Sequence, residues 1–270
     1  MKQLMPERNT GRLGKTMEGA EVFPIQQITG PGKQDARDIV ASERPLKIML
    51  NRRELITLLC TPLELEHLVI GFLFSEGWLN SKEALKEITV DKRQGIARVE
   101  SQADASASDT LTHDSANLPE EAASRFSLPA SRISALVKRF QHQSRLFRAS
   151  GGTHSAALCD EKNILAFSED IGRYNAIDKV VGKCILDDIP TSRHLLITSG
   201  RVSSRVVAKT ARMNIPVLVS RCAPTDRSVE LAAGSGITLI GFARGDKMNI
   251  YSGGWRIVTR RTRHLTDKGG

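Results

Sequence analysis

The stretch that decides the fold is TSGRVSSRVVAKTARMNIPVLVSRCAPT, residues 198–225. An apolar run at residues 195–198 predicts a buried strand, residues 203–213 predict a helix, and residues 217–219 predict a second buried strand. A strand, a crossover helix and a further strand are typical of a parallel sheet. Glycine and polar residues follow both strands, and open α/β sheets bind ligands at the carboxyl ends of their strands. The stretch therefore predicts an α/β fold with a ligand site at one sheet edge.

The strand–helix alternation extends in both directions from this stretch. Upstream, SGGTHSAALCD (residues 150–160) and SEDIGRYNAIDKVVG (residues 168–182) predict a pair of strands and then a helix. Downstream, Thr225 is a good N-cap for another helix, and GFARGDKMNIYSGG (residues 241–254) accompanies the last two strands. We therefore predict an α/β core over residues 126–254 with a mainly parallel sheet.

The first half of the chain predicts a smaller α+β lobe over residues 36–125. Two predicted hairpins enclose a helix with an apolar stripe, and Thr61, Pro62 and Glu64 form a sequence typical of a capping box at its start. Gly77 suits the position just after the end of that helix.

Three segments are expected to lie outside packed structure. Residues 1–35 show little periodicity and predict a flexible tail. Residues 101–125 are dominated by Ala, Ser, Asp and Thr, so they predict a mobile linker that ends the lobe. Residues 255–270 predict a basic tail, and a helix with one apolar face is expected near residues 131–147.

Composition restricts the classes of partner. The 270-residue chain carries a net charge of +9, which favours anions such as a nucleotide, a phosphorylated cofactor or nucleic acid. Aromatic content of 4% argues against single-strand nucleic-acid binding, and we expect no nucleic-acid partner. We find no apolar run of membrane-spanning length and no secretory signal, and the four cysteines are far apart. We therefore expect a cytoplasmic protein without a membrane partner.

Glycine-rich strand ends supply the first candidate binding residues. Ser199, Gly200 and Arg201 follow a buried strand and precede a helix, which is the arrangement of an anion cradle. Gly151 and Gly152 allow close backbone approach, and His154 could donate to a phosphate or act as an acid or base. The alternative for this second motif is a tight turn with a half-buried histidine.

Further candidates each have a structural alternative. Arg173 and Asn175 lie at a helix start, where they could bind ligand or belong to capping and a surface ion pair. Cys222 lies beside Arg221 and ahead of a helix, a setting that favours a thiolate, although most such cysteines are small packing residues. The loop Phe242, Ala243, Arg244, Gly245, Asp246 and Lys247 could equally be a polar turn.

Several enzyme motifs are missing from the sequence. We find no Walker loop, no three-glycine dinucleotide fingerprint and no G-x-S-x-G nucleophile elbow. Zinc deaminases require H-x-E and P-C-x-x-C, and this chain has no Cys-x-x-Cys. We therefore predict no metal site.

Together with ERPLKIMLNRREL (residues 43–55) and LVIGFLFSEGW (residues 68–78), these motifs in this order resemble the FdhD family, the formate dehydrogenase accessory proteins. The resemblance implies a three-layer, cytidine-deaminase-like core without zinc, an N-terminal lobe and a homodimer. It implies a sulfurtransferase-type accessory protein that carries sulfur from a cysteine desulfurase to the molybdenum bis(molybdopterin guanine dinucleotide) cofactor. That cofactor then enters the formate dehydrogenase catalytic subunit, and guanosine diphosphate is a partial mimic of it.

The resemblance also assigns residues. The loop from Phe242 to Lys247 matches the cofactor-binding loop of the family, and the glycine-rich blocks around His154, Arg173 and Ser199 match segments that line the same cleft. The family usually carries a Cys-Gly-x-Cys-Gly loop whose first cysteine holds a persulfide, but residues 101–125 contain no cysteine.

Two hypotheses follow from this difference. One is a sulfur-transferring maturation factor in which Cys222 is the remaining candidate thiol. The other is a non-enzymatic, cofactor-binding chaperone that lacks the sulfur relay.

Overall fold

The computed structural model describes residues 17–102 and 126–259. Its N-terminal elements are β1 (Ala20–Thr29), β2 (Gly32–Ala41), β3 (Arg44–Leu50), β4 (Arg53–Cys60), α1 (Leu65–Ser75), η1 (Lys82–Ala84), β5 (Leu85–Asp91) and β6 (Ile96–Ser101). The later elements are β7 (Leu128–Pro129), α3 (Ala130–Gln143), α4 (Arg145–Ser150), β8 (His154–Cys159), β9 (Ile164–Asp170), α5 (Arg173–Leu186), β10 (Leu195–Thr198), α6 (Ser204–Arg212), β11 (Val217–Ser220), α7 (Asp226–Gly234), β12 (Thr238–Arg244), β13 (Lys247–Ser252), η2 (Gly254–Arg256) and β14 (Ile257–Val258).

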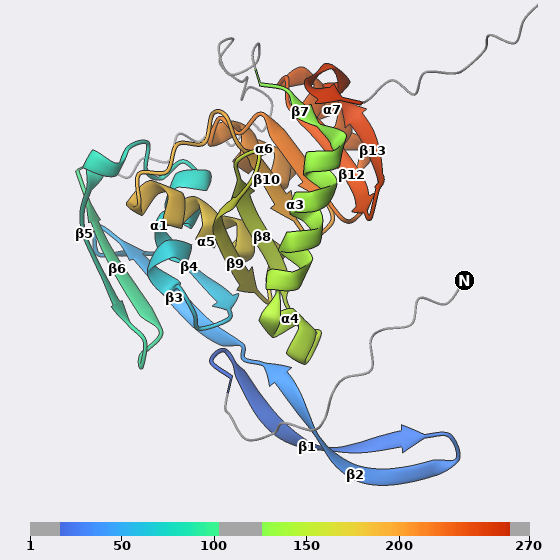
Figure 1. Ribbon diagram of the computed structural model, residues 1–270. Helices are drawn as coiled ribbons and strands as arrows, with labels where there is room; N and C mark the ends of the chain where they lie inside the picture. The colour runs from blue at the N-terminus through green and yellow to red at the C-terminus, as the bar shows by residue number, and fades with distance from the viewer. Residues whose placement is uncertain (1–16, 103–125, 260–270) are drawn as a thin grey trace, which may run out of the picture.

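The core is a six-stranded sheet in the order β13-β12-β11-β10-β8-β9 (Figure 1). The neighbouring strands β10, β11 and β12 are parallel to one another. The pairs β8–β9, β8–β10 and β12–β13 are antiparallel. The prediction of a mainly parallel sheet is therefore wrong, and the sheet is mixed. The physical reason is that short turns join β8 to β9 and β12 to β13, and a short turn can connect only antiparallel strands.

Helices cover both faces of this sheet. Alternate strand residues point to opposite faces, so Leu196 and Leu218 pack with α5, α6 and α7, while Ile197 and Val219 pack with α3. Figure 1 shows α3 lying across one face of the sheet, with α5 and α6 beyond it. The α/β class and the helices on both faces are confirmed.

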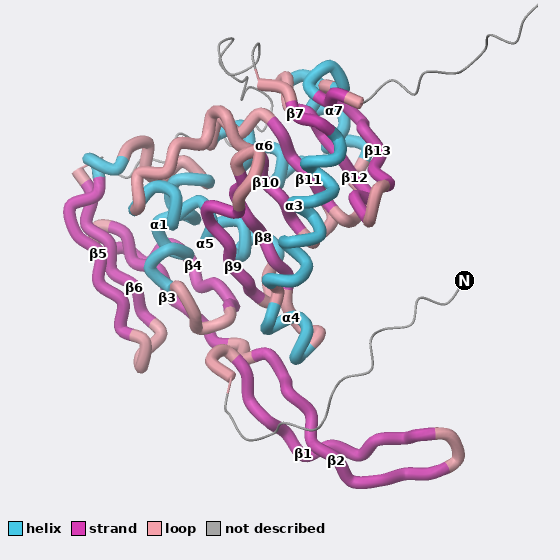
Figure 2. Tube along the Cα trace, in the orientation of Figure 1, coloured by secondary structure: helices cyan, strands magenta, loops and turns pink. Residues whose placement is uncertain are grey.

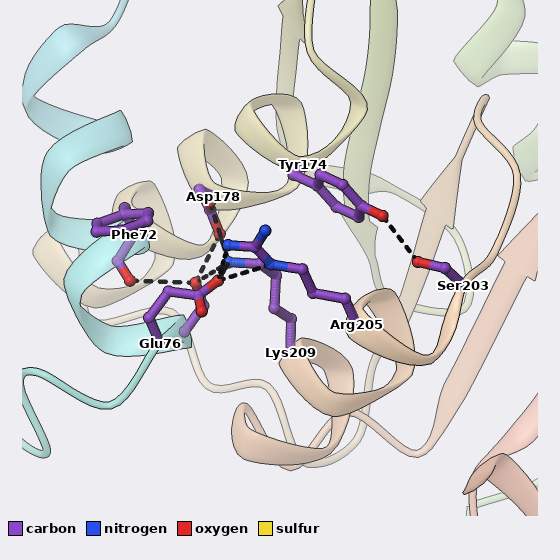
Figure 3. Close-up of polar contacts among 8 residues, drawn as sticks. Phe72, Glu76, Tyr174, Asp178, Ser203, Arg205 and Lys209 are labelled. Atoms are coloured by element: carbon purple, nitrogen blue, oxygen red, sulfur yellow. Dashed lines mark hydrogen bonds and ion pairs between the residues drawn. The ribbon is translucent and has the colours of Figure 1, made fainter. Parts of the chain in front are cut away.

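The lobe is a four-stranded sheet in the order β4-β3-β6-β5, and α1 covers one of its faces. The two predicted hairpins of the lobe are confirmed as β3–β4 and β5–β6. On its other side α1 packs against α5 of the core. Figure 3 shows Glu76, which caps α1, together with Asp178 of α5 and Lys209 of α6, joined by ion pairs. The lobe is thus fastened to the core by packing and buried charge.

Two glycines set the closeness of α1 to α5. A Cβ on Gly182 would lie 1.9 Å from the backbone oxygen of His67, and a Cβ on Gly71 would lie 1.7 Å from that of Asp178. We expect Gly182→Ala to lower the free energy of unfolding by about 2–3 kcal/mol, because the helices must separate. Urea unfolding measures this loss, with Gly234→Ala as the control because open space surrounds Gly234. A Gly182→Ala variant as stable as that control would contradict the crossing geometry.

Both predicted tails differ from the structure. Residues 20–41 form the antiparallel hairpin β1–β2, which projects from the body (Figure 2). Its strands are mostly exposed on both faces, so burial imposes no periodicity on the sequence. At the other end, Arg256 is fully buried and donates to the Gly236 carbonyl at 2.7 Å, and β14 pairs with β7. The basic tail therefore cannot begin at residue 255.

The predicted capping box of α1 is wrong. Glu64, not Thr61, is the N-cap of α1, and it makes no side-chain capping bond. The Thr61 hydroxyl instead accepts from the Ile171 N–H, while the Thr61 N–H donates to Asp170. Gly77 follows the C-cap with φ of 83°, as predicted.

Two further predictions concern the helix near residues 131–147 and the linker at residues 101–125. The helix expected near residues 131–147 is interrupted at Ser144, which separates α3 from α4. Most of the predicted linker, residues 103–125, lies outside the described residues. Within the described ranges no helix has the length and apolar character needed to cross a membrane.

Candidate functional site

A pocket of about 550 Å³ lies where β10 and β11 end and β8 begins. Because β8 runs antiparallel to β10, His154 at the start of β8 lies at the same edge as Ser199 after β10. The lining residues come from α3, α4, the start of β8, the end of β12 and the segments between elements: Phe140, Gln141, Ser144, Phe147, Arg148, Gly151, Gly152, Thr153, His154, Ser155, Ile171, Ser199, Arg221, Cys222 and Arg244. The strand ends where the sequence predicts a ligand site thus line a pocket, and ligand binding there stays a prediction.

Ser199, one of the lining residues, contacts three others. Its hydroxyl accepts from the Ser155 N–H at 2.9 Å and lies 3.3 Å from Nδ1 of His154. Its backbone oxygen accepts from the Cys222 thiol at 3.2 Å. One turn therefore places an imidazole and a thiol in the same pocket.

Arg221 and Arg244, joined by a hydrogen bond, form a positively charged wall of the pocket. Nε of Arg244 donates to the backbone oxygen of Arg221 at 3.1 Å. The Gln141 side-chain oxygen, in the amide orientation that satisfies its neighbours, accepts from Nη2 and Nε of Arg221 at 2.6 and 3.0 Å. Burial, followed by the nearby charge of Arg244, lowers the pKa of Arg221. The half-buried Arg221 guanidinium is therefore held by a neutral amide.

Within the described ranges no carboxylate forms an ion pair with the arginines of this wall. Among the residues that the structure describes, Arg148, Arg221 and Arg244 take part in no ion pair. Three guanidinium groups around one pocket repel one another until an anion joins them, and guanidinium groups bind phosphate oxygens with charge-assisted bonds. This arrangement favours an anionic ligand, and anion binding stays a prediction.

The structure brings six of the predicted residues together in the pocket: Gly151, Gly152, His154, Ser199, Cys222 and Arg244. Gly200 and Arg173 lie directly beside it. A Cβ on Gly200 would lie 3.0 Å from Cβ of Arg173 and 3.5 Å from Nδ1 of His154. Arg201, in the same loop, is exposed.

Two predicted binding residues have buried side chains outside the pocket lining, and their role in binding stays a prediction. The Asn175 amide is buried and donates to the Leu59 carbonyl at 2.8 Å and to Asp170 at 2.9 Å, because it joins α5 to the lobe. Ala243 is buried in the core beneath α3, because its strand position points inward.

Of the predicted loop at residues 242–247, only Arg244 belongs to the pocket lining. Phe242, Gly245, Asp246 and Lys247 are exposed where β12 turns into β13. Their role in binding stays a prediction.

Sequence reasoning missed nine of the lining residues, and four of these matter for the argument. Arg148 and Phe147 are on α4, Gln141 is on α3, and Arg221 enters the sequence analysis only as a neighbour of Cys222. Arg221 carried a usable signal, since it follows the buried strand β11 just as Arg201 closely follows β10. The helical residues gave none, because their arrival at the sheet edge depends on the break at Ser144.

The four cysteines differ in their exposure. Burial raises the pKa of Cys60, Cys159 and Cys184 to about 12 each, so these thiols stay protonated. Cys222 alone among them is partly exposed, and it lines the pocket. The helix start expected beside it is closed by the capping box of Thr225 and Ser228 on α7.

His154 gives the fold a pH dependence. Burial, followed by the charges of Arg173 and Arg201, lowers the pKa of His154 below 6.5. The unfolded chain then binds more protons than the folded one, so this stability is present above pH 6.5 and is lost as pH falls below it. We expect the unfolding free energy of His154→Gln, measured with urea, to fall less steeply than that of the wild type as pH decreases below 6.5. A slope equal to that of the wild type would contradict this assignment.

Fold and site together define a class of protein: a mixed α/β core with an arginine-lined pocket at its strand ends and a thiol in the pocket. The model of the FdhD/NarQ family matches residues 41–258, and the chain belongs to this family.

Named relatives and a solved structure agree with that family. The sulfur carrier protein FdhD of Bacillus pumilus is 35% identical over 238 residues, covering 82% of this chain and 91% of the relative. That of Bacillus subtilis is 35% identical over 236 residues, covering 80% and 88%. A crystal structure described as a formate dehydrogenase accessory protein from Desulfotalea psychrophila matches with a TM-score of 0.76 and 29% identity, covering 88% of this chain and 99% of that one.

Proposed function

We propose that this chain is a maturation factor for formate dehydrogenase whose pocket binds the phosphate-bearing part of the molybdenum bis(molybdopterin guanine dinucleotide) cofactor as cargo. The observation that carries the proposal is the set of three arginines in the pocket lining, none of which has an ion pair among the residues that the structure describes. The relatives named as sulfur carriers and the structure described as a formate dehydrogenase accessory protein support the same process.

We further propose that Cys222 receives sulfur. Its thiolate would attack the outer sulfur of a persulfide on a cysteine desulfurase, and the sulfur–sulfur bond of the donor would break. The donor cysteine leaves as a thiolate, and Cys222 holds the new persulfide, so the exchange needs no added oxidant or reductant. Cys222 is favoured over Cys60, Cys159 and Cys184 because those three are buried and protonated.

Intact-protein mass spectrometry after incubation with a cysteine desulfurase and cysteine tests this relay. We expect the wild type to gain one sulfur atom and Cys222→Ser to gain none. The matched control is Cys184→Ala, which removes a buried thiol and is expected to gain sulfur as the wild type does. Sulfur gain by Cys222→Ser, or none by the wild type, would contradict the relay.

A cofactor-binding chaperone without sulfur transfer is the second candidate. The specific observation in its favour is that residues 101–125 contain no cysteine, where related proteins usually carry the persulfide. Binding of guanosine diphosphate by a wild type that gains no sulfur would favour this candidate.

The remaining expectations are part of the same proposal. We propose a cytoplasmic homodimer that meets a cysteine desulfurase and the formate dehydrogenase catalytic subunit. The core is proposed to be cytidine-deaminase-like, which the helices on both faces of the sheet support.

A further inference from the structure

One wall of the pocket is a short segment that depends on its neighbours. This wall segment, residues 145–153, comprises α4 and the turn into β8, and it contributes Phe147 and Arg148 to the pocket. The helix α4 has only six residues, and so short a helix is not stable by its own hydrogen bonds. Its position must therefore come from contacts with the rest of the fold.

The usual capping residue does not hold α4. Ser144 is the N-cap, but it makes no side-chain capping bond. The Ser144 hydroxyl lies 2.8 Å from the Ser155 hydroxyl and 3.3 Å from the Phe140 backbone oxygen. The first N–H groups of α4 thus need an acceptor from elsewhere.

Glu169, on the neighbouring strand β9, is that acceptor. Its Oε2 accepts from the Leu146 N–H at 2.9 Å, and its Oε1 accepts from the Phe147 N–H at 2.8 Å. Oε1 also accepts from the Thr153 hydroxyl at 3.3 Å, at the other end of the wall segment. A single carboxylate therefore holds both ends of the segment against the sheet.

We infer that Glu169 is a positioning residue that fixes α4, and with it Arg148 and Phe147, for anion binding. This inference rests on the proposed function of the pocket. A carboxylate at a helix N-terminus is stabilised by two N–H donors and by the helix dipole. Without the Glu169 carboxylate, the wall segment becomes ordered only when the ligand binds. The free energy spent on that ordering lowers the affinity for the ligand.

The test compares Glu169→Ala and Glu169→Gln in calorimetric titration with guanosine diphosphate. We expect Glu169→Ala to weaken binding roughly tenfold, in line with the loss of a helix cap. Glu169→Gln should weaken it less, because one amide oxygen still accepts. Glu161→Ala is the matched control, since Glu161 is exposed in the β8–β9 turn.

A double-mutant cycle separates positioning from a general loss of structure. If Glu169 acts through α4, Glu169→Ala should reduce the affinity for guanosine diphosphate much less when Arg148 is already alanine. If the two residues act independently, the two losses of binding free energy should add. Faster hydrogen exchange at the Leu146 and Phe147 amides in Glu169→Ala should accompany the weaker binding.

The outcomes distinguish this inference from the function beneath it. If the wild type binds guanosine diphosphate and Glu169→Ala binds it equally well, the positioning role is overturned but the pocket function stands. The same follows if the affinity losses of Glu169→Ala and Arg148→Ala simply add in the double variant. A wild type that does not bind guanosine diphosphate would overturn the proposed pocket function, and the inference would fall with it.

Discussion

Replacing Arg221 with alanine is expected to weaken guanosine diphosphate binding by about tenfold to a hundredfold, the largest effect on affinity in the pocket. Hydrogen bonds to charged groups contribute about 1.5–3 kcal/mol, which corresponds to that range. Arg221 is half-buried, faces the pocket and is held by the neutral amide of Gln141. Arg244 is more exposed, so Arg244→Ala should lose less.

Isothermal titration of matched variants measures this effect. Arg221→Lys keeps the charge but loses the planar fork, so its affinity should fall between those of the wild type and the alanine variant. Arg132→Ala removes one exposed positive charge from α3 away from the pocket lining and controls for net charge. Equal losses in Arg132→Ala and Arg221→Ala would mean that only overall charge matters, contrary to the proposed site.

Replacing Lys209 with methionine is expected to cost about 3–5 kcal/mol of unfolding free energy, the largest effect on stability. Nζ of Lys209 lies 2.8 Å from Asp178 and 2.6 Å from Glu76, and it donates to the Ser75 hydroxyl (Figure 3). Burial raises the pKa of Asp178, and the charge of Lys209 opposes that shift. Removal of the lysine leaves the buried Asp178 without its cation at the junction of lobe and core, whereas Glu76 keeps its ion pair with Arg205.

Urea unfolding of paired variants tests this second prediction. The double variant Lys209→Met with Asp178→Asn should recover part of the loss, because it removes both members of the pair. Lys183→Met is the control, since Lys183 pairs with Asp187 at the surface and such pairs contribute little. A Lys209→Met variant as stable as Lys183→Met would contradict a structural role for the buried pair.

The core elements were predictable because their signals are local. The apolar runs at Leu195–Thr198 and Val217–Ser220 are buried strands, and the capping residue Thr225 begins α7 as expected. Burial on both faces forces continuous apolar runs, so such strands are visible in the sequence. The strand ends then placed Ser199 and His154 at one edge of the sheet.

Other features depend on contacts between distant residues. Thr61 resembles a helix cap, yet its hydroxyl and N–H are used by Ile171 and Asp170, more than a hundred residues away. Asn175 resembles a ligand residue at a helix start, yet it bonds to the Leu59 carbonyl of the lobe. Local patterns cannot reveal such partners, because the fold creates them.

In the pocket, too, some residues were predictable from local sequence and others depend on distant contacts. Glycine and serine at strand ends marked one part of the pocket lining, whereas the wall came from helices whose approach no periodicity encodes. The break at Ser144 redirects the chain into α4, and Glu169 holds that helix from another strand. Arg148 therefore reaches the pocket through tertiary contacts alone.

The most direct test of the anion pocket is calorimetric titration of the wild-type protein with guanosine diphosphate and, separately, with guanosine. Phosphate groups should supply most of the affinity, because the guanidinium groups of the pocket form no ion pair with any carboxylate in the described part of the chain. We predict measurable binding of guanosine diphosphate that weakens with added salt, and far weaker binding of guanosine. Equal affinity for the two, or no binding of guanosine diphosphate, would contradict the account.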